Sequence, residues 1–162
     1  MSIIIYNKVT SHTKGTCMFK RKKGDILLIC DTETTGLDPT NCFVIEVGLI
    51  AVDFRFEILN KYDSLVKLTN GKAMSFFKEC DEINDWAGDS KRASTIHKIA
   101  YPYFTAAAKN STQVVLEINN FLAHLHGSRY ILLSDNAYFD MTYFKQLYND
   151  VDRRWPFHYA AW

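Results

Sequence analysis

The chain has 162 residues, of which 48% are hydrophobic and 23% charged, and its formal net charge is +1. This composition is that of one ordinary globular domain, and it excludes a collagen-like, disordered or strongly charged protein. It also excludes a global positive field for attracting nucleic acid, so binding would depend on local groups. The N-terminal run SIIIY is too short for a membrane span or a signal sequence. We therefore expect no membrane partner and a cytoplasmic protein, or a nuclear one if its source is eukaryotic or viral.

The first segment, residues 1–24, contains six basic residues and no acidic ones, and four of the basic residues form the run KRKK. We predict a solvated terminal segment, with a contact to a phosphate backbone as the alternative. A single domain, residues 25–162, is expected to follow. The four cysteines (17, 30, 42 and 80) form no CxxC pair. They are expected to be reduced thiols rather than zinc ligands or a disulfide framework.

Three strands are predicted first along the domain. An apolar, β-rich strand runs from Asp25 to Asp31, a second spans residues 41–54, and a return strand spans residues 57–68. Gly48 is a possible bulge in the second strand. Together the three strands predict an antiparallel meander. From about residue 69 to residue 110 the periodicity fades, which indicates loops with one or two short helices.

Helical spacing returns in STQVVLEINNFLAHLHG, with Ser111 as a plausible N-cap and Gly127 as a plausible C′ residue just past the helix end. A short strand, RYILLS, follows. A second helix then begins at Asp140, with apolar residues repeating at a helical period. Helix, strand and helix after a meander predict an α/β fold with a mixed sheet, an antiparallel meander plus a parallel strand, flanked by helices.

The segment DTETTGLDP at the end of the first strand carries the chemistry. Asp31 and Glu33 are two positions apart, so their side chains share a face and lie about 6.6 Å apart along the strand. Paired carboxylates without a nearby Lys or Arg suit a hard cation such as Mg²⁺. Phosphodiester cleavage commonly uses two such ions, and Asp140 offers a third carboxylate. These residues predict a metal site that cuts phosphodiesters.

These motifs carry a family resemblance. DTETTGLDP resembles the first motif of the DEDD (DnaQ-like) 3′→5′ exonuclease superfamily, NAYFDMTYF resembles the second, and STIHKIA is similar to a segment between them. Order and spacing match from about residue 27 to residue 151. The resemblance implies a ribonuclease H-like fold with two Mg²⁺ or Mn²⁺ ions. It further implies hydrolysis of DNA or RNA from the 3′ end, with release of nucleoside monophosphates.

The resemblance also implies roles for individual residues. Thr34 would offer its backbone to the terminal 3′-hydroxyl, and Leu37 would wedge against the terminal bases. Single-stranded DNA or RNA 3′ ends are the expected partners, and a replication or repair partner is possible. Proofreading, RNA trimming and degradation of short oligonucleotides all share the first motif. The implied metal ligands and catalytic residues are Asp31, Glu33 and Asp140, and the implied substrate-binding residues are Thr32, Thr34, Leu37, His97 and Asn136.

Structural alternatives stand beside these roles. Thr34 could bond locally in a turn, Leu37 could only pack, and Asn136 could be a helix cap and nothing else. His97 could be a structural histidine. The cluster of Phe139, Tyr143 and Phe144 is expected to be core rather than a stacking platform.

The superfamily has a third motif, an Asp preceded by a His or Tyr general base, and the sequence departs from it. Asp150 and Asp152 lie too close to the second helix to replace that Asp, and His158 and Tyr159 follow the second motif too soon. We expect a chain that is incomplete at its C-terminal end, or a divergent member. One alternative function is a nucleic-acid-binding module without catalysis. The other is a haloacid-dehalogenase-type phosphatase, whose motif ends a similar strand.

Overall fold

The computed structural model describes residues 24–159. The predicted basic segment 1–24 therefore lies outside the described residues, apart from Gly24. The strands are β1 (Asp25–Thr34), β2 (Val44–Val52), β3 (Ile58–Lys67), β4 (Lys109–Asn110), β5 (Arg129–Leu133) and β6 (His158–Tyr159). The helices are α2 (Gly71–Ile83), α3 (Ser90–His97), α4 (Tyr101–Ala107), α5 (Ser111–Leu125) and α6 (Ala137–Asp150). In this part of the chain no helix is long and apolar enough to cross a membrane.

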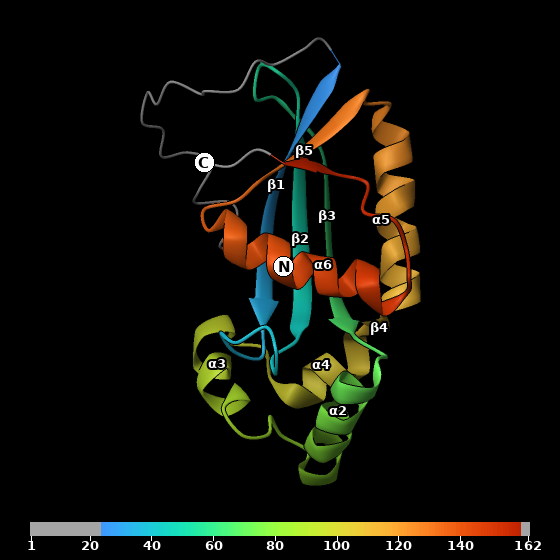
Figure 1. The fold of residues 1–162 in the computed structure, drawn as a ribbon. Coiled ribbons are helices and arrows are strands. Elements are labelled where there is room, and N and C mark those ends of the chain that lie inside the picture. Colours follow the sequence, from blue (N-terminus) through green and yellow to red (C-terminus); the bar gives the residue numbers. More distant parts are fainter. Residues whose placement is uncertain (1–23, 160–162) are drawn as a thin grey trace.

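The described strands form one mixed sheet in the order β4-β3-β2-β1-β5-β6 (Figure 1). β1, β2 and β3 are antiparallel neighbours, whereas β5 runs parallel to β1. The predicted meander with a parallel strand is confirmed. The predicted bulge at Gly48 is wrong, because Gly48 pairs regularly with Asp31 and Asp63. The register shifts instead between Glu33 and Thr34, and again near the end of β2.

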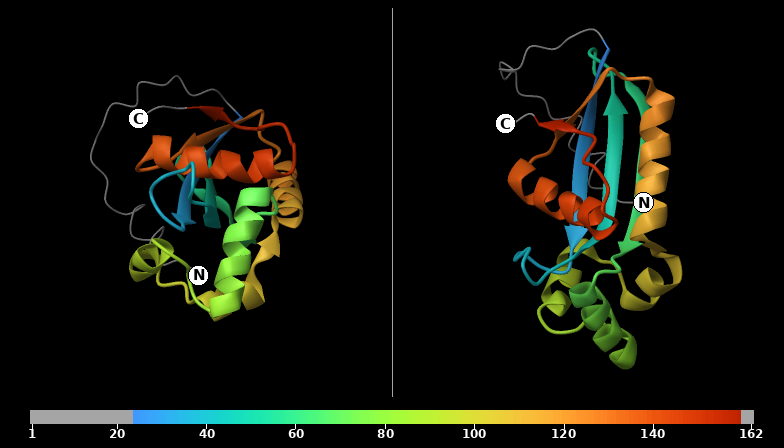
Figure 2. Two further views of the ribbon diagram at one scale, coloured as in Figure 1. Left: turned by 60° about the horizontal axis from the view of Figure 1, so that its bottom comes forward. Right: turned by 45° about the vertical axis from the view of Figure 1, so that its right-hand side comes forward.

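β1 lies in the middle of the sheet and is buried on both faces. Its even-numbered side chains, such as Leu28 and Cys30, join the main core with the apolar faces of α5 and α6. The odd-numbered Leu27 joins a smaller cluster with Ile50 and Ile131 on the other face. A strand covered on both sides needs a nearly continuous apolar run, which explains the sequence ILLIC. Helices α2, α3 and α4 gather at the end of the sheet where β1 finishes (Figures 1 and 2).

Residues 71–107 form three helices, where the sequence predicted loops with one or two short ones. They are held by aromatic contacts: Trp86 packs against Tyr101 (ring centroids 4.9 Å apart) and Phe104 (5.0 Å), and Phe77 stacks on Phe104 (5.5 Å). α3 and α4 have only 8 and 7 residues. Helices this short gain their stability from tertiary packing rather than from a visible periodicity.

The ends of α5 also differ from the prediction. Asn110, not Ser111, caps the helix, because its side chain accepts a hydrogen bond from the N–H of Gln113. At the other end of α5 the left-handed residue is His126, with φ of 50°, one position before the predicted Gly127. Gly127 is needed for a different reason, since a Cβ there would lie 2.6 Å from the Cγ1 atom of Ile26.

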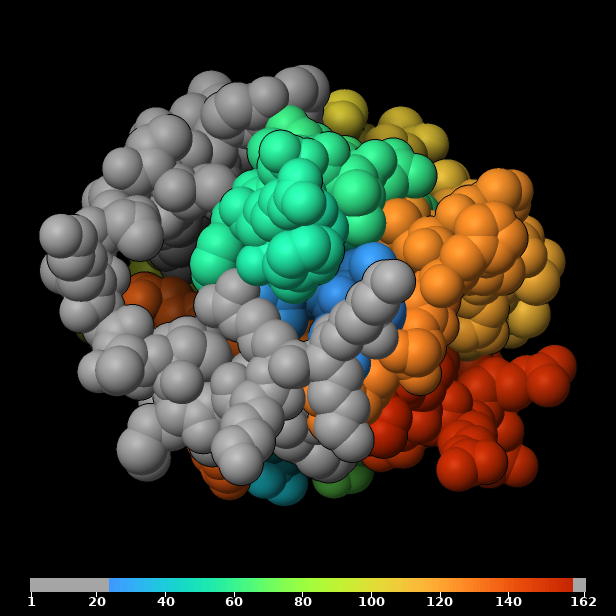
Figure 3. All heavy atoms as spheres, turned by 90° about the horizontal axis from the view of Figure 1, so that it is seen from above, coloured from blue at the N-terminus to red at the C-terminus, as the bar shows by residue number. Residues whose placement is uncertain are grey.

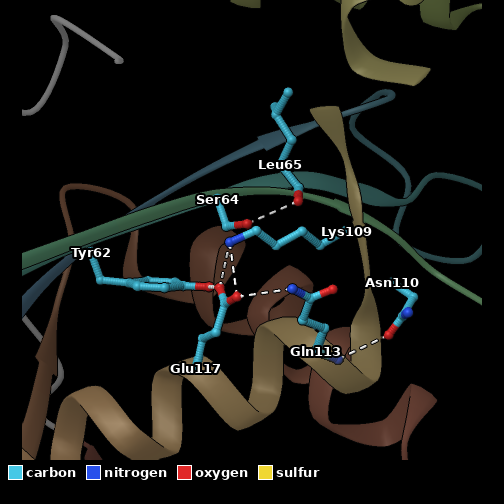
Figure 4. A network of polar contacts seen from close by, with 7 residues as sticks. All are labelled: Tyr62, Ser64, Leu65, Lys109, Asn110, Gln113 and Glu117. Carbon is cyan, nitrogen blue, oxygen red and sulfur yellow. Dashed lines mark hydrogen bonds and ion pairs between the residues drawn. The ribbon is translucent and has the colours of Figure 1, made fainter. Parts of the chain in front are cut away.

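A polar network fixes α5 against β3 and β4 (Figure 4). The Glu117 carboxylate accepts hydrogen bonds from Lys109 Nζ (2.9 and 2.7 Å), Tyr62 Oη (3.1 Å) and Gln113 Nε2 (3.2 Å). Burial alone would raise the pKa of Glu117, but these bonds hold the pKa below its usual value.

The sheet has a second end, away from α2, α3 and α4, which is seen from above in Figure 3. There the β2–β3 turn lies beside the start of β1 and the end of α5.

The last residue of α6, Asp150, joins three helices. Its carboxylate accepts hydrogen bonds from Thr69 N (2.8 Å), Thr69 Oγ1 (2.9 Å), Asn70 N (2.7 Å) and the Ser111 hydroxyl. These groups precede α2 and begin α5. Burial alone would raise the pKa of Asp150, but the hydrogen bonds, with that of Ser111 first, outweigh it and lower the pKa.

Asp150→Asn should destabilise the fold by about 1–3 kcal/mol, because four donors, one of them on the buried Ser111, lose a charged acceptor. The folded-state pKa lies below the ordinary 3.8. The stabilisation is therefore present above that pH and is lost as the pH falls through the folded-state pKa. Urea unfolding at pH 7 measures the difference. The exposed neighbour Asp152 has φ of 49°, which asparagine tolerates, so Asp152→Asn is the control. Equal stability of the two variants would contradict the expected role.

Candidate active site

Two carboxylates share a face of β1 near its C-terminal end. Asp31 and Glu33 alternate with Thr32 along the strand, and the residues opposite them on β2 are Gly48 and Glu46. Directly opposed residues of an antiparallel pair point to the same face, so Glu46 lies beside Glu33. This face is the one that carries the smaller apolar cluster. Three acidic residues therefore project from one end of the β1–β2 pair.

Glu46 was not identified from the sequence. It is the only charged residue in the nine-residue strand VIEVGLIAV, and it is 9% exposed. Charged residues are almost never this buried unless other groups compensate them, so a lone charge in an apolar strand is a usable signal. The sequence does not fix the register, however, and only the register places Glu46 opposite Glu33.

Asp140 reaches β1 from the main-core side. It lies in the first turn of α6, is 5% exposed, and accepts hydrogen bonds from Thr32 N (2.9 Å) and Thr32 Oγ1 (2.7 Å) through Oδ1. The Ser134 hydroxyl donates to Oδ2. Thr32 points away from the face of Asp31 and Glu33. The structure therefore brings Asp140 to the same position along β1 but engages both of its oxygens there.

The carboxylates of Asp31 and Asp140 both lie close enough to Cys30 of β1 to affect the pKa of its thiol. Burial raises the pKa of the Cys30 thiol, and the carboxylates of Asp140 and Asp31 raise it further. Within residues 24–159, no group of three or more His, Cys, Asp or Glu side chains is placed to share one metal ion. The ligand role of Asp140 stays a prediction. Cys30, Cys42 and Cys80 are free cysteines in the described part of the chain, and their reduced state stays a prediction.

The segment that follows β1, residues 35–43, is called here the Leu37 loop. Leu37 is 82% exposed, so the alternative that it only packs is wrong. The rest of the loop is held firmly. At its base the Thr35 N–H donates to the Phe43 carbonyl, and the Phe43 N–H donates to Thr35 Oγ1 (both 2.9 Å). The Asp38 carboxylate accepts two more hydrogen bonds within the loop.

Helix α6 contacts the same loop. The Tyr143 hydroxyl donates to the Gly36 carbonyl (2.8 Å), and the Gln146 side chain bonds the far side of the loop. A Cβ at Gly36 would lie 2.6 Å from the Cys42 Sγ atom, so only glycine fits there without a shift. Tyr143 belongs to the core cluster as predicted. Its hydroxyl contact and the part played by Gln146 were not identified from the sequence.

The predicted substrate-binding residues have local contacts. Thr34 Oγ1 donates to the Gly36 carbonyl (2.7 Å), which is the turn bond weighed as an alternative. The Asn136 side chain caps α6 by accepting from the Phe139 N–H (3.4 Å). Thr32 is 7% exposed, and both its hydroxyl and its N–H donate to Asp140. Contacts of these residues with a substrate stay predictions.

His97 ends α3 beside the ring of Trp86, at 5.6 Å between centroids. Its Nδ1 accepts the Ile99 N–H (3.0 Å), which places the proton of the neutral ring on Nε2. Nε2 is buried and has no hydrogen-bond partner in the structure. Burial lowers the pKa of His97 to about 4, so the ring is neutral at physiological pH. The Nε2–H group of His97 is therefore a buried donor without an acceptor in the structure.

His158 does not lie beside the carboxylates. It is paired with Ile131 in the sheet, and Ile131 is level with Leu27 of β1. Four residues of strand separate Leu27 from Asp31, which is about 13 Å along the strand. Two strand spacings add a further separation of about 10 Å.

A family model described as Exonuclease (RNase T) matches residues 28–154. The chain therefore belongs to the RNase T exonuclease family. This family is DnaQ-like, so the resemblance to the DEDD superfamily is confirmed. The alternative of a haloacid-dehalogenase-type phosphatase is wrong, because the exonuclease match spans both motifs. The described residues thus belong to a nucleic-acid exonuclease domain.

Solved structures of E. coli exonuclease I share the fold of this exonuclease domain. The complex with a dA16 oligonucleotide has a TM-score of 0.57 and 16% identity, over 77% of this chain and 24% of that chain. The complex with a 5cy-dA13 oligonucleotide has a TM-score of 0.59 and 16% identity, over 85% and 28%. The domain spans about a quarter of exonuclease I. This likeness confirms the ribonuclease H-like fold. No curated protein sequence matches the chain.

His97→Asn should remove an acid-sensitive part of the stability. The folded-state pKa of His97 is about 4 and the ordinary value is 6.5, so the unfolded state binds the proton more readily between these values. Folding stability therefore falls as the pH falls from 6.5 toward 4. Asparagine keeps an acceptor near Nδ1 but does not titrate there. Urea unfolding at pH 7 and pH 4.5 should show a smaller loss for the variant. The exposed His124→Asn is the control, and identical losses in all three proteins would contradict the prediction.

Proposed function

We propose that this exonuclease domain removes nucleotides from the 3′ end of a single strand in a reaction that depends on divalent metal ions. One observation carries the proposal: Asp31 and Glu33 share a face at the end of β1, and the loop that follows holds Leu37 out into solvent. Paired carboxylates suit ions that bind phosphate. An exposed leucine on a fixed loop suits the flat face of a terminal base.

The donor chemistry of the site fits Mg²⁺ or Mn²⁺, and we propose two ions per site. Asp31 and Glu33 would hold them, and Glu46 adds a negative charge on the same face. Such ions, when bound, lower the pKa of water and stabilise the charge on the leaving oxygen. The chain's own part is to bind and orient the strand: the Thr34 backbone meets the 3′-hydroxyl and Leu37 meets the terminal base. A zinc-bound form of an exonuclease I–ssDNA complex supports a divalent ion in this fold.

Single-stranded DNA is the substrate that we favour over RNA. The support is that E. coli exonuclease I, which shares the fold, has been solved with dA16 and dT13 oligonucleotides. A role in proofreading and a replication or repair partner stay predictions.

A second function is favoured by one observation. Both oxygens of Asp140 are engaged by Thr32 and Ser134, so this carboxylate is positioned to join α6 to β1. A domain in which Asp140 only has this structural role would bind single strands without cutting them. An assay of single-strand degradation, described next, separates the two functions.

Asp31→Asn should abolish 3′-end degradation while the fold is kept, because asparagine preserves the shape of the side chain and deletes the charge that holds a cation. The assay uses 5′-labelled single-stranded DNA and RNA with Mg²⁺, Mn²⁺ or EDTA. A ladder that shortens from the 3′ end with metal, and no ladder with EDTA, is expected of the wild type. Asp152→Asn, at an exposed residue just past the C-terminal end of α6, should behave like the wild type. A metal-independent ladder, or an active Asp31→Asn variant, would contradict the proposal. Binding without any ladder would favour the second function.

Leu37→Ala should weaken binding of a 3′ end and leave thermal stability unchanged. The side chain is 82% exposed, so truncation avoids the cost of about 2–5 kcal/mol that a buried leucine carries. Fluorescence anisotropy of a 5′-labelled single strand in EDTA and a melting curve measure the two effects. Leu116→Ala, at a leucine of α5 that is 59% exposed, is the matched control and should change neither. A melting shift of several degrees without loss of binding would point to a structural role instead.

A further inference from the structure

Three residues of α6, spaced three positions apart, contact the segment that runs from the end of β1 to the start of β2. Asp140 bonds Thr32 in β1, and Tyr143 bonds the first half of the Leu37 loop. Gln146 bonds its second half. Residues three apart are neighbours on a helix surface, so the three side chains form one stripe.

The bonds of Gln146 use its whole amide. Its Nε2 donates to two loop carbonyls, and its Oε1 accepts one N–H at the start of β2. The partners are Pro39 O (3.0 Å), Cys42 O (2.9 Å) and Val44 N (3.2 Å). With the bond from the Tyr143 hydroxyl to Gly36 O (2.8 Å), both backbone limbs beside Leu37 are fixed to the helix. These bonds of Tyr143 and Gln146 are called here the bracket, and Leu37 is the exposed tip of the loop that they hold.

We infer that Tyr143 and Gln146 are positioning residues, which hold Leu37 at the height and angle that the terminal base of a single strand requires. This inference rests on the proposed function. Both residues bond loop carbonyls, so each would act through the loop backbone rather than by contact with the substrate. An apolar side chain on a loose loop would fold down against the protein to escape water. A bracketed loop keeps it out and spares the ordering cost when the strand binds.

The bracket also links the loop to the candidate catalytic strand. Because Asp140 lies on the same stripe, α6 fixes β1 and the loop to one rigid element. The distance between the Asp31–Glu33 face and Leu37 is therefore set by a helix rather than by the loop itself. A site that places a terminal base and a scissile phosphate at the same time needs such a fixed distance.

The test compares end-specific binding by the full chain. Gln146→Met keeps the length of the side chain and removes its hydrogen bonds, and Tyr143→Phe removes only the hydroxyl. Tyr148→Phe is the matched control, because Tyr148 lies on the same helix but its hydroxyl donates to Asn119 (3.3 Å), away from the loop. Binding to a linear single strand is measured in EDTA against a circular strand that has no 3′ end. Exonuclease I has been solved with ssDNA in a metal-free form, which supports the use of EDTA.

We expect Gln146→Met and Tyr143→Phe each to weaken linear-strand binding about three- to tenfold, the scale of one or two net hydrogen bonds. Circular-strand binding and the Tyr148→Phe variant should be unchanged. In a Leu37→Ala background the same two substitutions should change binding less than about twofold, since the side chain that they position is gone. Such coupling is specific to a positioning role, because a general loss of stability would be additive.

Full additivity with Leu37→Ala, or equal loss on linear and circular strands, overturns the inference while leaving the proposed function intact. Wild-type binding by both bracket variants also overturns it. If the wild-type chain itself fails to bind a linear strand, the proposed function fails, and the positioning role falls with it. The wild-type measurement therefore distinguishes the two failures.

Discussion

The hydrogen bonds between Asp140 and Thr32 are the contact on which the rest of the site depends. A carboxylate that is 5% exposed is costly to bury unless donors compensate it, and here the Thr32 N–H, the Thr32 hydroxyl and the Ser134 hydroxyl do so. Hydrogen bonds to a charged group contribute about 1.5–3 kcal/mol each, so the set offsets much of that cost. The first turn of α6 is thereby fixed to the strand that carries Asp31 and Glu33, and every later residue of the helix has a defined place along that strand.

Because of this contact, one face of β1 is fixed to α6 and the other carries the candidate catalytic carboxylates. Thr32 faces the main core and meets Asp140, whereas its neighbours Asp31 and Glu33 face the opposite side. The polar core contact thus fixes the strand from behind without using the residues in front. Burial, and then the carboxylates of Asp140 and Asp31, raise the pKa of the Cys30 thiol, so this neighbour of Asp31 stays neutral and adds no negative charge. Glu46 increases the negative charge in front, which makes the face a better place for a cation than for an anion.

The sequence was sufficient for the meander and for the shared face of Asp31 and Glu33, because alternation in a strand is a local property. It was insufficient where distant residues decide. The aromatic contacts of Trp86 that stabilise short helices join residues without a common period. Glu46 becomes part of the site only through strand register, and the amide of Gln146 reaches loop carbonyls 107 and 104 positions away. In the sequence alone, a glutamine of an amphipathic helix that bonds a distant loop looks the same as a glutamine that faces solvent.

The contacts of Asp150 bear on how this family can vary. Thr69 Oγ1 lies 3.3 Å from Ser111 Oγ although the two residues are 42 positions apart, and both donate to Asp150. The segment between them, which contains α2, α3 and α4, is therefore closed at its base by the core of the domain. The entropy of closing such a segment grows only slowly with length, by about 0.6 kcal/mol for each doubling. Residues inserted into the exposed connections between these helices should therefore cost little closure entropy, and the sheet and α6 would keep their geometry.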